Sequence, residues 1–268
     1  MTDRLRTLAA QLSGAGIENP LQEARWFMEL AASRGLAPAQ LAEWIRRRCA
    51  GEPFQYIVGT AAFYNIELSV GPGVLVPRPE TELLVEQALA LLSYAVPGSR
   101  ILDLCTGSGA IALAMAHERC DLDFTGIDLS EKALEWALLN RQRLKISNCR
   151  FLAGDLFAPL PPLRQFTMVT ANPPYVSSAE YQNLESVVKD YEPRMALEAA
   201  ENGLAVEYQI IAQAPQYLQP GGCLLLEIGN TQGGEVRDRL LAHGYQSVRI
   251  LPDLSGQDRI ALGCLPHA

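Results

Sequence analysis

The chain has 268 residues, of which 49% are hydrophobic and 19% charged, enough to bury one full α/β core with a smaller unit beside it. Its formal net charge of −8 disfavours a broad nucleic-acid-binding surface, and no apolar stretch approaches membrane-spanning length. We therefore expect a monomeric globular protein of the cytoplasm, with no direct contact to nucleic acid or membrane.

The six cysteines show no spacing typical of a metal site or of a redox motif. They are Cys49, Cys105, Cys120, Cys149, Cys223 and Cys264, and no two of them form a C-x-x-C pair. We predict reduced, mostly buried thiols without a disulfide framework. The three histidines are also isolated, so the sequence predicts no metal site.

The N-terminal region, residues 1–52, is expected to be a small helical domain. Its apolar spacing predicts helices over residues 4–12, 20–34 and 39–49. The residues expected in its core are Trp26, Phe27, Leu30, Leu41, Trp44 and Ile45.

Residues 53–78 read as a β-hairpin linker, because strand-like residues alternate there and glycines interrupt them. Residues 79–268 then show the alternation of a doubly wound α/β domain. We expect strands near 101–105, 124–128, 150–153, 167–171 and 223–228, and helices near 81–93, 109–118, 131–143 and 203–218. The tail predicts an antiparallel hairpin from strands 246–251 and 258–264.

A glycine-containing loop follows the first predicted strand of this domain. The loop is Thr106, Gly107, Ser108 and Gly109, and a helix of small residues comes next. Glycine lets the backbone approach a ligand closely, and a helix N-terminus directs N–H groups at it. A second strand ends in Asp128, whose carboxylate can accept hydrogen bonds from ribose hydroxyls. This pattern predicts a nucleoside-cofactor site, but by itself it fits NAD and S-adenosylmethionine equally.

The tetrapeptide Asn172-Pro173-Pro174-Tyr175 follows the apolar run 166–171. Two prolines cannot continue a strand ladder, so the strand should end at Asn172 and a stiff turn should follow. At the carboxyl end of a parallel strand this turn can present an amide, rigid carbonyls and an aromatic face to a planar nitrogen group. A dehydrogenase needs no such turn, which favours S-adenosylmethionine. A loop over a buried tyrosine is the structural alternative.

Over nearly its whole length the chain resembles the peptide chain release factor glutamine N5-methyltransferases. The shared motifs are residues 74–82 (VLVPRPETE), 103–111, Asn172 to Tyr175, 191–193 with 196–197, and 253–259 (DLSGQDR). The resemblance implies a doubly wound, mostly parallel seven-stranded sheet of the S-adenosylmethionine-dependent methyltransferase type. It also implies methylation of the side-chain amide nitrogen of glutamine in the Gly-Gly-Gln motif of release factors, with the N-terminal domain helping to dock the substrate.

The same resemblance assigns roles to individual residues. Catalysis would involve Asn172, Pro173 and Tyr175, and substrate binding would involve Asn172, Pro173, Pro174 and Tyr175. S-adenosyl-L-methionine would contact Asp103, Cys105, Thr106, Gly107, Ser108, Gly109, Asp128, Asp155, Leu156 and Asn172. Asp103 and Asp155 have a capping role as the structural alternative, and for Arg78 a salt-bridged hinge is favoured.

Two other substrates and one non-catalytic function stay open. Cys105 stands where the release-factor family often has glycine, and the run Cys-Thr-Gly-Ser-Gly resembles the methyltransferases of a ribosomal protein's glutamine. Adenine N6 of nucleic acid would also fit the Asn-Pro-Pro-Tyr turn, but it needs base flipping and usually a basic surface. A cofactor-binding scaffold without activity is the third alternative.

Overall fold

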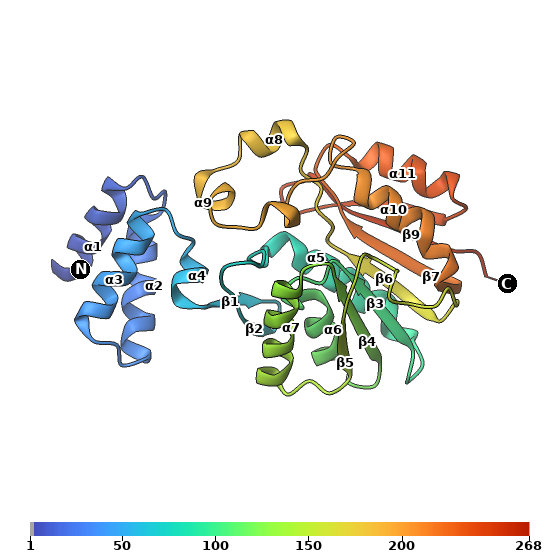
Figure 1. The fold of residues 1–268 in the computed structure, drawn as a ribbon, viewed down its shortest axis with the longest axis horizontal. Coiled ribbons are helices and arrows are strands. Elements are labelled where there is room, and N and C mark those ends of the chain that lie inside the picture. Colours follow the sequence, from blue (N-terminus) through green and yellow to red (C-terminus); the bar gives the residue numbers. More distant parts are fainter. Residues whose placement is uncertain (1–2, 268) are drawn as a thin grey trace.

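The computed structural model describes residues 3–267, and its N-terminal part is a bundle of three helices set apart from the rest (Figure 1). These are α1 (Asp3–Gly14), α2 (Pro20–Ser33) and α3 (Pro38–Cys49), close to the predicted ranges. Phe27, Leu41 and Ile45 are buried between them, but Trp26, also expected in the core, is 47% exposed. Trp26 meets Phe54 edge-on instead, with ring centroids 5.9 Å apart. Helical spacing alone therefore overestimated its burial.

The predicted hairpin follows the bundle, but a short helix precedes it. The helix is α4 (Phe54–Val58), and the antiparallel hairpin strands are β1 (Thr60–Phe63) and β2 (Ile66–Ser69). Pro53 occupies the N-cap of α4, and Gly59 ends the helix in the left-handed conformation, with φ 77°. The aromatic and β-branched residues of α4 favour a strand locally, so propensity misassigned them.

Seven strands form one sheet in the order β5-β4-β3-β6-β7-β9-β8. The first five strands in this order are parallel, and β9 runs antiparallel to β7 and to β8. The strands are β3 (Arg100–Leu104), β4 (Asp123–Asp128), β5 (Cys149–Ala153), β6 (Phe166–Ala171), β7 (Leu218–Glu227), β8 (Gln246–Pro252) and β9 (Asp258–Cys264). The predicted strands and the antiparallel tail are thus confirmed.

Helices cover both faces of the sheet, and each face has its own apolar cluster (Figure 1). Alternation along β3 divides its side chains between the clusters, so Ile101 and Leu102 lie on opposite faces. The cluster of Ile101 includes residues of α5 (Pro79–Leu91), α6 (Ala110–Glu118) and α7 (Glu131–Leu144). The cluster of Leu102 includes residues of α10 (Ala205–Gln213) and α11 (Gly233–Ala242). Helix α11 was not predicted.

In the described part of the chain, no helix combines the length and apolarity needed to cross a membrane.

A segment between β6 and α10 extends toward the N-terminal bundle (Figure 1). It contains α8 (Ser178–Gln182), α9 (Ser186–Lys189) and the 3-10 turn η2 (Arg194–Ala196). Two further 3-10 turns lie outside this segment: η1 (Leu92–Tyr94) follows α5, and η3 (Ala214–Gln216) follows α10. The Tyr191 hydroxyl donates a hydrogen bond to the Ala50 carbonyl, at 2.9 Å. The segment therefore connects the sheet domain to the end of the bundle.

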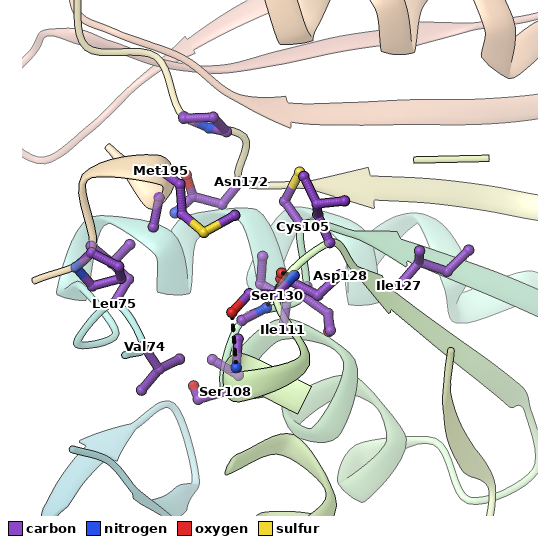
Figure 2. Close-up of a pocket in the computed structure, with 18 of the residues that line it drawn as sticks. Val74, Leu75, Cys105, Ser108, Ile111, Ile127, Asp128, Ser130, Asn172 and Met195 are labelled. Carbon is purple, nitrogen blue, oxygen red and sulfur yellow. Dashed lines mark hydrogen bonds between the residues drawn. The ribbon is translucent and has the colours of Figure 1, made fainter. Parts of the chain in front are cut away.

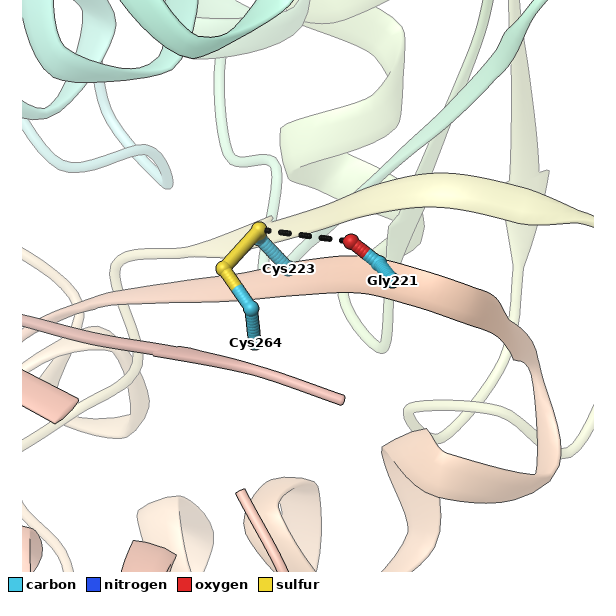
Figure 3. Close-up of a disulfide and its surroundings, with 3 residues drawn as sticks. All are labelled: Gly221, Cys223 and Cys264. Carbon is cyan, nitrogen blue, oxygen red and sulfur yellow. Dashed lines mark hydrogen bonds between the residues drawn. A yellow bond between two sulfur atoms is a disulfide. The ribbon is translucent and has the colours of Figure 1, made fainter. Parts of the chain in front are cut away.

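Two cysteines differ from the prediction of reduced thiols. Cys223 of β7 and Cys264 of β9 form a disulfide (Figure 3). The antiparallel register places the two residues opposite each other, with 4.0 Å between their Cα atoms. They are 41 residues apart in the chain, so no local spacing announced the pair. Of the four free thiols only Cys149 is buried, so the expectation of mostly buried thiols was also wrong.

Glu207 of α10 is fully buried, and neither of its carboxylate oxygens has a hydrogen-bond partner among residues 3–267. Burial raises the pKa of Glu207 to about 8. Between the pKa of an unfolded glutamate, about 4.3, and this value, the folded protein binds more protons than the unfolded chain, so stability falls as pH rises.

As pH rises from about 4.3 to about 8, we expect Glu207 to lower the free energy of unfolding by at most about 1.4 kcal/mol per pH unit. Chemical denaturation at several pH values would measure the slope, and Glu207→Gln should flatten it. Glu86→Gln, at an exposed position of α5, should leave the slope unchanged. Equal slopes for wild type and Glu207→Gln would contradict the assignment.

Candidate active site

A cavity of about 310 Å³ lies at the carboxyl ends of β3, β4 and β6 (Figure 2). Nine of the predicted site residues line it: Cys105, Thr106, Gly107, Ser108, Asp128, Asp155, Leu156, Asn172 and Pro174. The other four, Asp103, Gly109, Pro173 and Tyr175, are not among the residues that line it. The fold thus brings the glycine-containing loop and the Asn-Pro-Pro-Tyr turn to one cavity, although they are far apart in the sequence.

The glycine-containing loop joins β3 to α6 through left-handed backbone. Gly107 and Gly109 have φ angles of 57° and 80°. A Cβ atom at Gly109 would lie 2.9 Å from side-chain atoms of Leu113 and Phe151, so a larger residue would displace them and strain the left-handed backbone. Cys105 also has a positive φ, 54°, a backbone conformation that favours glycine.

Asp103 is buried beneath the loop and braces it. Its carboxylate accepts hydrogen bonds from the hydroxyls of Thr106, at 2.6 Å, and of Thr170 on β6, at 2.9 Å. Burial raises the pKa of Asp103 to about 7, against the effect of these hydrogen bonds. The contacts that Asp103 makes are those of its structural alternative, a loop cap.

Asp128 lines the cavity at the end of β4 and is held by two backbone N–H groups. Gly107 donates to one carboxylate oxygen at 2.7 Å, and Ser130 donates to the other at 2.8 Å. Each oxygen keeps acceptor capacity for a further hydrogen bond. Burial raises the pKa of Asp128, while the N–H donors oppose the shift.

The Asn-Pro-Pro-Tyr turn presents Asn172 to the cavity and directs the Tyr175 hydroxyl to Glu227 at the end of β7. The Asn172 side-chain NH₂ donates to the Thr81 hydroxyl at 3.1 Å, and the Tyr175 hydroxyl donates to Glu227 at 3.1 Å. No histidine or lysine is among the residues that line the cavity. The lining therefore offers hydrogen-bond acceptors for orienting a group, without a strong base.

Sequence reasoning missed part of the cavity wall. Leu129, which follows Asp128, is 61% exposed and lines the cavity, as does Met195 of η2 (Figure 2). Thr81 lines it too, and its hydroxyl donates to Glu227 at 2.6 Å. An apolar residue after an acid at a strand end is a signal that could have identified Leu129. Nothing local distinguishes Met195, because its position depends on the path of the segment after β6.

The salt bridge expected for Arg78 is present. Its guanidinium lies 2.6 Å from the Glu192 carboxylate, and the Val76 N–H donates to the other oxygen of Glu192 at 3.2 Å. Burial raises the pKa of Glu192, and the charge and hydrogen bond of Arg78 lower it. Two of the motifs recognised in the sequence, residues 74–82 and 191–193, thus meet at this ion pair.

Asn140 of α7 supports the loop from behind. Its side-chain oxygen accepts from the Ser69 N–H at 2.6 Å, and its NH₂ donates to the carbonyls of Ser69 and Ser108, both at 3.0 Å.

Asn140→Leu would leave these buried backbone groups without a partner. We expect the free energy of unfolding to fall by about 2 to 4 kcal/mol in urea denaturation. The exposed Gln142→Ala on the same helix serves as the control, and a loss in Asn140→Leu no larger than in this control would contradict the prediction.

Comparisons with known proteins agree with this geometry. A family profile described as Methyltransferase domain matches residues 95–247. The chain is 38% identical to the release factor glutamine methyltransferase of Escherichia coli, covering 97% of this chain and 96% of the relative. It is 45% identical to the protein of that name from Thermodesulfovibrio yellowstonii, covering 81% and 78%.

Solved structures show the same fold in more distant proteins. A T. thermophilus 16S rRNA N2 G1207 methyltransferase, in complex with AdoMet and guanosine, superposes with a TM-score of 0.56 at 18% identity. The match covers 77% of this chain and 49% of the other. At this identity the likeness concerns the fold alone.

Proposed function

Because the chain belongs to the family of release factor glutamine methyltransferases, we propose that its cavity brings a glutamine side chain of the substrate against S-adenosyl-L-methionine. The protein is an S-adenosylmethionine-dependent protein-(glutamine-N5) methyltransferase whose substrates are peptide chain release factors. The glutamine is that of the Gly-Gly-Gln motif. The observation that carries this proposal is the presence of Asn172 and Asp128 in the lining of one cavity.

The residues of the cavity fit the cofactor. Loop residues 106–109 would surround its methionine part, Asp128 would bind the ribose hydroxyls, and Asp155 with Leu156 would contact the adenine. The free acceptor capacity of Asp128 matches a pair of hydroxyl donors. Bound S-adenosyl-L-methionine supplies an electrophilic methyl group on its sulfonium sulfur.

The chain's own contribution to the chemistry is orientation. An amide nitrogen is a poor nucleophile because its lone pair is delocalised into the carbonyl. If the Asn172 oxygen and the Pro173 carbonyl each accept one N–H of the target amide, the nitrogen lone pair is directed at the methyl group. Such alignment can lower the barrier by roughly 7 to 11 kcal/mol. The two oxygens also stabilise the positive charge that develops on nitrogen, and the product cation is acidic enough to lose its proton to water.

The remaining assignments follow from the substrate. The N-terminal domain predicted from the sequence would help to dock the release factor, and the enzyme would act as a monomer in the cytoplasm, where translation takes place. The Tyr175 ring would pack on the flat amide while its hydroxyl is held by Glu227.

Asn172→Ala tests the catalytic role. We expect turnover to fall by about 100-fold or more, because the amide loses an acceptor that aligns it, while cofactor affinity changes little. Peptide mass spectrometry after incubation with S-adenosyl-L-methionine and an unmethylated release factor measures the single added methyl. A ribosomal protein and duplex DNA are the parallel substrates. Methylation of either of these, with the release factor unmodified, would overturn the proposed substrate, and loss of cofactor binding alone would overturn the role of Asn172.

Asp128→Ala should have the opposite profile. Removal of the carboxylate takes away two acceptors for ribose hydroxyls, so we expect the Kd for the cofactor to rise roughly 10-fold or more. Isothermal titration calorimetry measures this directly, with Asn172→Ala as the matched variant in the same cavity. Unchanged affinity in Asp128→Ala would remove Asp128 from the cofactor site.

A further inference from the structure

Four side chains form a hydrogen-bonded chain at the Asn-Pro-Pro-Tyr turn, and two of them, Asn172 and Tyr175, belong to the turn itself. The Asn172 NH₂ donates to Thr81 of α5 at 3.1 Å, and the Thr81 hydroxyl donates to Glu227 at the end of β7 at 2.6 Å. The second oxygen of Glu227 accepts from the Tyr175 hydroxyl at 3.1 Å. The side chains of Thr81 and Glu227 belong to residues only 3% and 1% exposed, so water does not compete for these bonds.

The direction of this chain is fixed by the number of protons in it. When Glu227 is ionised its carboxylate has acceptors only, so the single proton of the Thr81 hydroxyl goes to Glu227, in agreement with the 2.6 Å contact between them. The Thr81 oxygen is then left as an acceptor, and it is the NH₂ of Asn172, not the oxygen, that can face it. Burial raises the pKa of Glu227, while the hydrogen bonds from Thr81 and Tyr175 and the positive charge of Arg259 act against that shift.

The consequence appears at the other end of the Asn172 amide. Its oxygen accepts no hydrogen bond among residues 3–267, yet the buried side-chain atoms without a partner in this range are the two oxygens of Glu207. The Asn172 oxygen is therefore accessible, and Asn172 lines the cavity. A flipped Asn172 amide would have almost the same shape, but it would present N–H donors to a substrate nitrogen that itself carries N–H donors.

We propose that Thr81 and Glu227 are positioning residues of the methyl transfer, which hold the Asn172 amide so that its oxygen faces the substrate glutamine. This inference rests on the proposed function. Glutamate is required at 227 because two hydroxyl donors, from Thr81 and Tyr175, approach its two oxygens. A glutamine there would offer one acceptor to both.

Thr81→Val tests the proposal because it keeps the shape and removes the hydroxyl. We expect kcat to fall roughly 10-fold or more, with KM for the release factor and Kd for the cofactor within about threefold of wild type. Thr81→Ser restores the hydroxyl and should recover the turnover. Thr231→Val, at an exposed loop position after β7, is the matched control for the same substitution.

A double-mutant cycle separates positioning from a purely structural role. In the Asn172→Ala background there is no amide to orient, so Thr81→Val should cost little further turnover. Glu227→Gln is the second, independent variant, and it replaces Thr81→Val in the test if Thr81→Val does not fold. We expect Glu227→Gln also to lower kcat roughly 10-fold or more. Wild-type turnover in Thr81→Val or Glu227→Gln would overturn the proposal, as would an undiminished loss in the Asn172→Ala background. A wild-type protein that leaves the release factor unmethylated would overturn the proposed function and this inference with it.

Discussion

The parallel pairing of β3 with β6 is the constraint on which the whole site depends. In this register Leu104 lies opposite Ala171, so the next residues, Cys105 and Asn172, leave the sheet at the same level. Strand β4 lies on the other side of β3, so the strand order reverses between β3 and β6. The cavity lies at this switch point, outside the carboxyl ends of the strands. Had the register shifted by one residue, the side chains at the strand ends would have changed faces and the two loops would no longer share a cavity.

The two halves of the cavity are supported by different hydrogen-bonded groups. Behind the loop, Asp103 and Asn140 bind its hydroxyl and carbonyl groups, and behind the turn, Thr81 and Glu227 bind its amide and phenol. Asp103 is the link between the two halves, since it also accepts from Thr170 on the strand that leads into the turn. Apart from Asp103, the loop and the turn have separate supports. This is the physical reason that cofactor affinity and turnover should respond to different substitutions.

The sequence was sufficient for those features that local chemistry determines. Strand ends, glycine positions and the proline turn all follow from short patterns, and nine of the predicted site residues line one cavity. It was not sufficient where two distant segments meet. The disulfide between Cys223 and Cys264 depends on the register of β7 with β9, and the contact of Glu227 with Thr81 depends on the packing of α5 beside the end of β7. Helices α4, α8, α9 and α11 were missed because short or weakly patterned segments carry little periodic signal.

Cys105 belongs to the cofactor side of the site, and this limits what it says about the substrate. Its left-handed backbone costs an L-residue roughly 1 to 2 kcal/mol relative to glycine. This cost concerns the conformation of the loop and does not distinguish one substrate from another. The turn itself also discriminates weakly, because an amide NH₂ and an adenine amine offer the same two donors to it. Selection must therefore come from elements around the turn. The segment after β6 is the element placed to contribute, because Met195 lines the cavity while Tyr191 and Glu192 bind the N-terminal bundle and the residues before α5. Through these contacts the segment joins the wall of the cavity to the end of the N-terminal bundle.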